Sequence, residues 1–550
     1  MSLFALFSLA LFFLCSCFCF TPSNGASDPI YESFLKCLPT QSPQPDPTIS
    51  TIVYSHRSNS SAYTTVLQAY IKNSRLNTTS TPKPAVIITP TKESHVQATI
   101  LCAKKLNIQI KIRSGGHDYE GISYISSEKN FIVLDMFNFQ KVDVNIATET
   151  VVVQAGAQLG ELYYRIWEKS NVHGFPAGVC PTVGVGGHLS GGGYGTMLRK
   201  YGLSVDHMID ARIVDVKGNI LDRKSMGEDL FWAIRGGGGA SFGVILSYTV
   251  KLVPVPKVNT VFRIMKTANE NALELIYKWQ LVSSTIDNDL FIRALLQPMT
   301  INNTKTVRAS FVAHFLGDAE RLVALMTNKF PELGLNKEDC IEISWIQSVL
   351  FWTNLDYNTT IPKILLNRHS DNPSFLKRKS DYVQTPISKS GLKSIFDKLS
   401  ELGKVGFVFN PYGGRMNEVA SHATPFPHRA GNLFKIQYSV NWNDADPKQA
   451  TNYLNQTRVL YSFMTNYVSK NPRGAFLNYR DLDIGVMKGT GKSGYNSGKV
   501  YGEKYFMGNF DRLVKVKTVV DPDNFFRNEQ SIPILFKKST GNSRKMTTLV

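Results

Sequence analysis

The 550-residue sequence predicts an α+β fold with two or three domains. Strand and helix signals alternate from about residue 84 to residue 250, beginning with a β-α-β unit. After residue 257 the pattern changes to strands of alternating polarity mixed with helices, which indicates a second domain with an antiparallel sheet. Two glycine-rich stretches interrupt the first part, and their composition predicts loops that approach a ligand closely.

The chain begins with a segment that is expected to be removed. Residues 3–20 are almost wholly apolar and are followed by small, polar residues, which is typical of a secretory signal peptide cleaved near Ala26. The start of the run carries no Lys or Arg, which departs from the usual signal peptide. A membrane anchor is the alternative, because the run is just long enough to span a bilayer. We expect a soluble product in the apoplast or cell wall, with the vacuole left open.

The formal net charge is +18, which is large for an enzyme. A basic balance can indicate nucleic acid, a polyanionic wall polysaccharide or simple solubility. Secretion argues against nucleic acid and leaves an acidic wall polysaccharide as a candidate partner. The short basic run Lys377-Arg-Lys379 is interpreted as a solvated face.

In the first domain, His117 is predicted to lie just beyond the end of a strand. Its helix presents Val96, Ile100 and Leu101 on one face, and the strand that follows ends just before His117. The expected elements are a strand at 84–90, a helix at 94–106, strands at 107–113, 131–135 and 150–154, and an amphipathic helix at 159–169.

The glycine-rich stretches run from Arg113 to Gly121 and from Cys180 to Gly195, and the second holds seven glycines in sixteen residues. Glycine is entropically costly to order, so a solvent-exposed turn gains nothing from so many. Backbone that lacks Cβ atoms and exposes N–H groups suits phosphates or a flat ring. We therefore predict a ligand cradle, with His117 and Cys180 as its reactive side chains, in preference to two surface turns.

Other motifs carry less weight. No G-x-G-x-x-G is completed, and the P-loop-like stretch from Gly485 to Ser493 has one residue too many between its glycines. The G-x-S-x-G at Gly239–Gly243 is followed by a strand-like run, whereas a nucleophile elbow needs a helix there. The ten histidines form no H-x-H or H-E-x-x-H, and no C-x-x-C occurs, so no metal site is expected.

The two glycine-rich stretches resemble those of the berberine-bridge-enzyme-like family of plant flavoproteins, in the vanillyl-alcohol-oxidase superfamily. The likeness continues through 425–428, 434–438, 478–483 and 520–526. It implies a two-part FAD-binding domain of the vanillyl-alcohol-oxidase type and a substrate domain in which helices cover an antiparallel sheet. The expected divisions are a signal peptide at 1–26, the FAD-binding domain at 27–256, the substrate-binding domain at 257–477, a segment returning to the FAD domain at 478–536, and a disordered basic tail at 537–550.

The resemblance also implies how the cofactor is held. In this family a histidine bonds to the flavin 8α-methyl group and a cysteine bonds to flavin C6, which implies bicovalent FAD on His117 and Cys180. The residue three after the cysteine controls access of dioxygen, and Val183 implies an oxidase. The remaining cofactor-binding residues expected are Arg113, Ser114, Gly115, Gly116, Gly184, Gly187, Gly191, Gly192 and His188, the last with a structural role.

Candidate catalytic residues lie in the second domain and in the glycine-rich loops. Strand alternation points Lys435 and Gln437 to one face, and the pattern alone favours an exposed polar face. The resemblance places both beside the substrate and makes Tyr479 the catalytic base, with Tyr119 and Tyr194 nearby. A cation within about 4 Å stabilises a phenolate by up to about 4 kcal/mol before desolvation, and Lys435 is expected to supply it.

Gln437 narrows the chemistry. Berberine bridge enzymes proper use Glu as base at this position, and Gln cannot accept a proton, so an alkaloid-type mechanism is disfavoured. The pattern resembles the alcohol oxidisers of the family, which act on monolignols or on the anomeric carbon of oligosaccharides and yield hydrogen peroxide. The alternatives are an oxidative cyclase or related enzyme acting on an alkaloid or phenolic, and a flavin-carrying wall protein with little catalysis.

Cysteine usage and sequons agree with secretion. Three of the seven cysteines leave with the leader, and several pairings of the other four are open from sequence alone. The resemblance implies a disulfide between Cys37 and Cys102, with Cys340 free and buried. Glycosylation is expected at some of the five N-x-Ser/Thr sequons, which are Asn59, Asn77, Asn302, Asn358 and Asn455.

Overall fold

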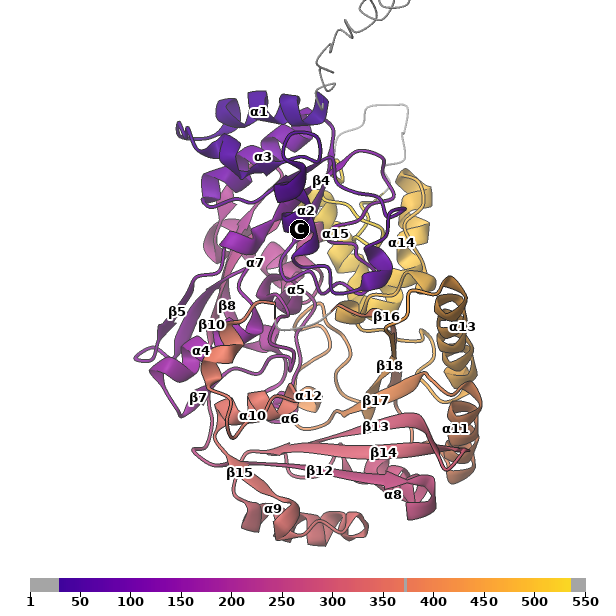
Figure 1. The fold of residues 1–550 in the computed structure, drawn as a ribbon. Coiled ribbons are helices and arrows are strands. Elements are labelled where there is room, and N and C mark those ends of the chain that lie inside the picture. The colour runs from indigo at the N-terminus through magenta and orange to yellow at the C-terminus, as the bar shows by residue number, and fades with distance from the viewer. Residues whose placement is uncertain (1–28, 370–372, 536–550) are drawn as a thin grey trace, which may run out of the picture.

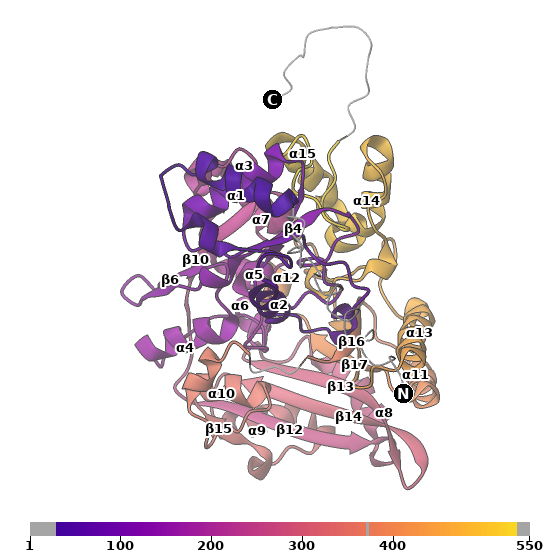
Figure 2. The ribbon, with the colours of Figure 1, turned by 45° about the horizontal axis from the view of Figure 1, so that its top comes forward.

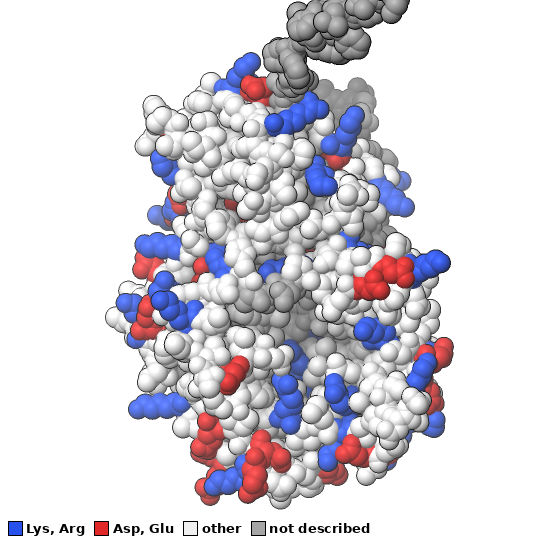
Figure 3. Space-filling view, in the orientation of Figure 1, with Lys and Arg blue, Asp and Glu red and all other residues white. Residues whose placement is uncertain are grey.

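The structure is a computed structural model, and it describes residues 29–369 and 373–535 (Figure 1). The predicted signal peptide and the predicted disordered tail lie outside these residues. Within the described ranges, no helix is long and apolar enough to cross a membrane. Basic and acidic side chains are interspersed over the face seen in Figure 3.

The first domain contains the predicted β-α-β unit, which the structure forms from residues 86–113. Its four-stranded sheet has the order β1-β2-β4-β3, and β2, β4 and β3 run parallel. Helix α1 (Pro29–Gln41) packs on the helix that follows β2, α3 (Glu93–Lys105), and the predicted disulfide between Cys37 and Cys102 joins the two helices. The strands are β1 (Val53–Tyr54), β2 (Val86–Ile88), β3 (Gln109–Arg113) and β4 (Phe131–Asp135).

A second, antiparallel sheet completes this domain, in the order β5-β6-β10-β8-β9. Two predicted elements are confirmed here, the strand at 150–154 as β6 and the helix at 159–169 as α4. The second glycine-rich stretch contains a short helix that was not predicted, α5 (Val185–Ser190). The bounds are β5 (Val142–Asn145), β6 (Thr150–Gln154), α4 (Leu159–Lys169), β8 (Met208–Val214), β9 (Ile220–Leu221), α7 (Arg223–Ile234) and β10 (Val244–Lys251).

The second domain is built on a seven-stranded antiparallel sheet, as predicted, in the order β15-β12-β14-β13-β17-β18-β16. Helices α8 (Ala272–Val282), α11 (Lys389–Leu402) and α13 (Pro447–Phe463) cover one face (Figures 1 and 2). The strands are β12 (Asn259–Thr267), β13 (Leu290–Ile301), β14 (Thr304–Phe315), β15 (Ile341–Ile343), β16 (Phe375–Val383), β17 (Gly406–Pro411) and β18 (Phe434–Trp442).

Strand alternation decides which side chains face the first domain. On β18, Ile436 and Tyr438 belong to the apolar core under the helices. Lys435 and Gln437 therefore lie on the opposite face, as the sequence pattern predicted. On β13 the same alternation sets Arg293 apart from Ile292 and Ala294 of that core.

The end of the chain packs against the first domain. Helix α15 (Phe510–Val520) contacts α7, and α14 (Gly491–Phe506) contacts α15. The buried Lys517 donates to the carbonyl oxygens of Ser241 and Phe526 at 2.7 Å each, and to Asp521 at 2.6 Å. Leu513 of α15 lies against the glycine run at 236–239, since a Cβ atom added to Gly237 would come within 2.6 Å of its side chain.

A buried arginine joins the two domains. Arg199, in α6 (Leu198–Tyr201), is 1% exposed, and no carboxylate lies in a salt bridge with it among the described residues. Its guanidinium donates instead to five backbone carbonyls of the second domain, those of Ser284, Ile286, Asp287, Leu290 and Tyr412.

The interpretation of residues 377–379 as a solvated face is wrong. Lys377 is 2% exposed and Lys379 is 1% exposed, and both are held in ion pairs at the edge strand β16. The sequence pattern could not show the carboxylates that pair with them, because those lie about 100 residues or more away in the chain.

Candidate active site

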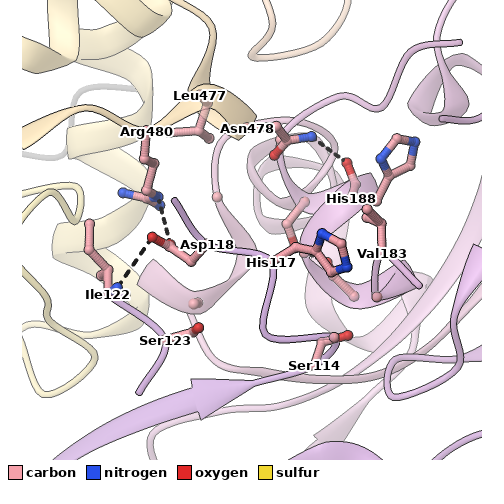
Figure 4. Close-up of a pocket in the computed structure, with 18 of the residues that line it drawn as sticks. Ser114, His117, Asp118, Ile122, Ser123, Val183, His188, Leu477, Asn478 and Arg480 are labelled. Carbon is pink, nitrogen blue, oxygen red and sulfur yellow. Dashed lines mark hydrogen bonds and ion pairs between the residues drawn. The ribbon is translucent and has the colours of Figure 1, made fainter. Parts of the chain in front are cut away.

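A cavity of about 380 Å³ lies between the two domains. Both glycine-rich stretches and residues 476–480 contribute to its wall (Figure 4). The sheet of the second domain contributes Arg293, Val408 and Gln437. Ten glycines line it: Gly115, Gly116, Gly178, Gly184, Gly186, Gly187, Gly191, Gly238, Gly239 and Gly243. A wall with so little side-chain bulk fits a large, flat ligand that backbone must approach closely.

The two glycine-rich stretches touch each other through backbone. A Cβ atom added to Gly115 would lie 2.2 Å from the amide nitrogen of Gly184, and one added to Gly184 would lie 2.2 Å from that of Gly115. No other residue allows this approach. It brings the His117 side chain beside the second stretch, where its Nε2 lies 2.7 Å from the Thr182 hydroxyl.

The cysteine loop is held by His188. Cys180 is exposed to the cavity, and two residues earlier the amide of Gly178 lies 3.1 Å from His188 Nε2. Burial, with a contribution from Lys435, lowers the pKa of His188 to about 3, so the ring is neutral and Nε2 accepts this hydrogen bond. His188 therefore supports the loop, in agreement with its expected structural role.

Asn478 ties the C-terminal part to the same loop. Its amide donates to the His188 carbonyl at 2.9 Å, as Figure 4 shows. A Cβ atom on Gly191 would lie 1.9 Å from the Asn478 side-chain oxygen, so glycine is needed there as well. At Gly187 there is nothing within 4 Å of an added Cβ atom, because that position faces the open cavity.

On the substrate side, three tyrosines gather around the cavity. The hydroxyls of Tyr194 and Tyr479 are hydrogen-bonded to each other, and Gln437 Nε2 donates to the Tyr119 hydroxyl at 3.2 Å. The ring centroids of Tyr119 and Tyr479 are 5.8 Å apart. The structure thus brings together the four predicted residues that line the cavity on this side.

Lys435 lies behind this layer and not in the cavity wall. It is fully buried, and its Nζ lies 3.2 Å from the ring centroid of Tyr194 and 4.7 Å from that of Tyr479. Lys435 therefore lies beside the ring of Tyr479 and closer to that of Tyr194. The structure does not support the expected role of Lys435 as the cation for the phenolate, because burial and then Arg293 lower the pKa of Lys435 well below its ordinary value.

Arg293 is the cation that the sequence analysis missed. It lines the cavity, and its Nε donates to Asn410 Oδ1 at 2.8 Å. Burial raises the pKa of Tyr479 well above its ordinary value, Tyr194 and Tyr119 add to the rise, and Arg293 opposes it. A single charged residue within the apolar run at 290–296 is a signal that could have identified it.

Two residues predicted to bind the cofactor lie outside the cavity wall. The Arg113 guanidinium is buried in an ion pair with Asp135 at 2.7 Å and donates to two backbone carbonyls, so its role is structural. An added Cβ atom on Gly192 would meet the Phe426 ring at 3.1 Å, so this glycine serves packing. The other predicted cofactor residues line the wall, and Val183 is among them.

The glycine run at 236–239 was missed as a site, although its composition is the same signal as in the two stretches. Gly238 and Gly239 line the cavity. Ser241 is buried, its hydroxyl accepts from the Ile532 amide at 3.2 Å, and strand β10 follows it. This geometry is not a nucleophile elbow, which needs a helix after an exposed serine.

Peripheral predictions are met in different degrees. Cys340 forms no disulfide and is half-buried, so the expectation that it is buried is wrong in degree. Four sequon asparagines, Asn77, Asn302, Asn358 and Asn455, are exposed, whereas Asn59 is half-buried and accepts from the Ser55 amide at 2.8 Å. Glycosylation stays a prediction. No group of three or more potential metal ligands occurs in the part of the chain described.

The cavity and its fold define an FAD-dependent oxidoreductase. Residues 84–223 match the profile of an FAD binding domain, and residues 475–533 match the profile described as berberine and berberine like. The chain is 59% identical over 531 residues to berberine bridge enzyme-like 21 of Arabidopsis thaliana, over 96% of this chain and 98% of the relative. It belongs to the berberine bridge enzyme-like family.

Solved structures agree with this assignment. Phl p 4, a grass pollen allergen with glucose dehydrogenase activity, superposes with a TM-score of 0.86 at 45% identity, over 92% of this chain and 100% of its own. A variant of berberine bridge enzyme superposes with a TM-score of 0.85 at 37% identity, over 91% and 100%. The neighbours include both oxidases and dehydrogenases.

Proposed function

We propose that the protein is a secreted alcohol oxidase with FAD bound covalently to His117 and Cys180. The observation that carries the proposal is the meeting of Tyr479, Tyr194 and Arg293 at one end of a glycine-lined cavity that also exposes His117 and Cys180. FAD, when bound, accepts a hydride and transfers the electrons to dioxygen, giving hydrogen peroxide.

The residues of the cavity wall fit FAD, because some leave room for its ring and others support the two loops that would attach it. The cavity wall leaves room for a flat ring where Gly187 faces open space, and the contact between Gly115 and Gly184 brings the two attachment loops together. His188 keeps the cysteine loop in place through Gly178. These contacts support a cofactor held from two sides, one by each loop.

Tyr479 is the general base for the alcohol proton. Its hydroxyl is bonded to that of Tyr194, which donates a hydrogen bond to the phenolate once the Tyr479 proton has left. The Arg293 guanidinium lowers the pKa of Tyr479 and so favours the phenolate against the effect of burial. Gln437 and Tyr119, which are hydrogen-bonded, orient the substrate and do not accept its proton.

The substrate class is an alcohol, either a sugar hydroxyl or a monolignol. Glucose oxidase and glucose dehydrogenase activities are printed for structural neighbours at 45% identity, which supports the sugar. In that neighbour, an isoleucine-to-valine variant is a glucose oxidase, whereas the parent is a glucose dehydrogenase. Val183 in the cavity wall supports dioxygen as the acceptor here.

Secretion to the cell wall rests on three features. The leader has the composition of a signal peptide. The Cys37–Cys102 disulfide suits an oxidising compartment, and four sequon asparagines are exposed. An acidic wall polysaccharide is a partner of fitting charge for a chain of net charge +18.

The test is an anaerobic substrate panel on the purified holoprotein, with glucose, cello-oligomers, oligogalacturonides and coniferyl alcohol, together with an alkaloid and a phenolic that is not an alcohol. We expect at least one alcohol to bleach the flavin absorbance, and admitted air to restore it with one hydrogen peroxide per flavin. Bleaching only by an alkaloid or a phenolic that is not an alcohol would support the cyclase alternative. A flavin that no compound reduces would support the wall-protein alternative and contradict the proposal.

A further inference from the structure

Behind the cavity tyrosines lies a cluster of buried charges centred on two lysines of the edge strand β16. Lys377 Nζ is paired with Glu120 Oε1, and with Asp481 Oδ1 at 2.7 Å. Lys379 Nζ is paired with Asp481 Oδ2 at 2.5 Å and with Asp483 Oδ2 at 3.0 Å. The four side chains of Lys377, Lys379, Glu120 and Asp481 are at most 6% exposed.

The inner part of this cluster is electrically balanced. The two lysines, Lys377 and Lys379, face two buried carboxylates, Glu120 and Asp481. Two arginines that are more exposed lie at its edge, where Arg458 pairs with Asp483 and Arg75 pairs with Glu120, each at 3.0 Å. Burial alone would lower the pKa of Lys377, but Asp481 and Glu120 outweigh it and raise that pKa, so the ammonium persists. Buried ions are retained only where such pairing compensates their desolvation.

The partners of the two lysines differ in where they lie along the chain. Glu120 directly follows Tyr119 in the first glycine-rich loop, and Asp481 lies two residues after Tyr479. Lys377 is paired with both of these carboxylates, whereas the carboxylates paired with Lys379 both belong to the segment after Tyr479. Lys377 therefore bridges the two segments that carry these tyrosines, and Lys379 does not.

A second contact holds the first glycine-rich stretch, at Tyr119, to strand β16. Asn73 Nδ2 donates to the Tyr119 carbonyl at 2.9 Å and to the Leu376 carbonyl at 3.4 Å, one residue before Lys377. Tyr119 is thus fixed to β16 through its carbonyl and through its neighbour Glu120. The Tyr119 ring, whose centroid is 5.8 Å from that of Tyr479, belongs to the residue that these two contacts hold.

We propose that Lys377 is a positioning residue that sets the relative placement of Tyr119 and Tyr479 by bridging Glu120 and Asp481. The proposal rests on the function proposed above, in which Tyr479 accepts the alcohol proton and Tyr119 orients the substrate. Misplacement of a catalytic group by about 1 Å costs about 100-fold in rate. A change at Lys377, which does not line the cavity, is therefore expected to slow flavin reduction.

The test compares Lys377→Met with Lys379→Met in the flavin-loaded protein. Both changes remove one buried ammonium from the same strand, so both are expected to lower the melting temperature. Only Lys377→Met is expected to slow the limiting rate of anaerobic flavin reduction, by about 10- to 100-fold, with Lys379→Met within about threefold of wild type and Lys377→Arg restoring part of the rate. Equal slowing by both methionine variants would overturn the proposal.

Hydrogen–deuterium exchange supplies a readout that does not depend on turnover. Lys377→Met should exchange faster than wild type in peptides covering both 117–122 and 478–482, and Lys379→Met only in the latter. Faster exchange in a single segment of Lys377→Met would contradict the bridge. If Lys377→Met does not fold, Glu120→Gln is the substitute, since it weakens the bridge and leaves the ion pair of Lys377 with Asp481. If no alcohol reduces the wild type, the proposed function fails, and the exchange data alone decide whether Lys377 joins the two segments.

Discussion

The hydroxyls of Tyr194 and Tyr479 are hydrogen-bonded across the cavity, although 285 residues separate them in the chain. One comes from the second glycine-rich stretch and the other from the segment that returns after the second domain. The pair exists only when both parts of the FAD-binding domain are in place. The hydrogen bond between Tyr479 and Tyr194 therefore forms only in the fully assembled site.

The covalent links are the first prediction. Because His117 and Cys180 lie on loops whose backbones touch, both are expected to hold the flavin. Protein precipitated in acid should stay yellow in the wild type, in Cys180→Ala and in His117→Ala, since one link remains in each variant. The double variant should release all flavin to the supernatant. Colourless precipitated wild-type protein would refute the bicovalent attachment.

The second prediction concerns dioxygen. Val183 lines the cavity, and leucine adds one methylene there. We expect Val183→Leu to slow reoxidation of the reduced flavin by at least about tenfold, or roughly 1.4 kcal/mol of barrier, with little effect on reduction by substrate. Val179→Leu is the matched control, since Val179 lies in the same loop and also lines the cavity. Equal reoxidation rates in stopped-flow traces of wild type and Val183→Leu would remove Val183 as the gate.

The third prediction is the pH dependence. Flavin reduction needs the Tyr479 phenolate, whose pKa is raised by burial, so the rate should increase with pH. Arg293 lowers that pKa, and Arg293→Met should move the rise in rate to higher pH. Lys435→Met should move it less, because the pKa of Lys435 is itself well below its ordinary value and the amine is largely uncharged where Tyr479 titrates.

Rate–pH profiles of Arg293→Met and Lys435→Met decide which of the two side chains supports the Tyr479 phenolate. A larger upward shift for Lys435→Met than for Arg293→Met would show that Lys435 is the cation that supports the phenolate. That result would reinstate the role expected from the sequence.

The fourth prediction concerns stability. Replacing Arg199 by Met removes a donor from five backbone carbonyls at the domain boundary, of which that of Asp287 keeps another donor, the Leu290 amide at 3.1 Å. Leaving buried acceptors unsatisfied costs about 1–3 kcal/mol each, so we expect a loss of at least about 3 kcal/mol in the free energy of unfolding. Arg415→Met is the control, because its pair with Glu418 is half exposed and such pairs contribute about 0–1 kcal/mol. Urea unfolding curves that coincide for the two variants would contradict the role given to Arg199.

Local pattern was enough to predict the elements that line the site. Strand alternation placed Lys435 and Gln437 on one face, and the β-α-β unit placed His117 at a strand end, because both depend on near neighbours in sequence. The glycine-rich stretches predicted the cradle for the same reason, since a lack of side-chain bulk is visible in composition.

Residues whose environment is built from distant segments could not be predicted. The local sequence predicts a surface position for Lys377, whereas in the structure it is buried and paired with Glu120 and Asp481. Arg113 was expected to bind the cofactor, whereas in the structure it is paired with Asp135. The pKa of Lys435 depends on its burial and on Arg293, and neither property is encoded near residue 435.

The most direct test of the account is the single-turnover anaerobic reduction of Tyr479→Phe by the best alcohol found for the wild type. Phenylalanine preserves the ring packing against Phe476 and Tyr194 and removes only the hydroxyl. We predict a protein that keeps its covalent flavin and reduces it about 10²- to 10⁴-fold more slowly than wild type, the usual contribution of a general base. Reduction at the wild-type rate would show that Tyr479 is not the base and would contradict the proposed mechanism.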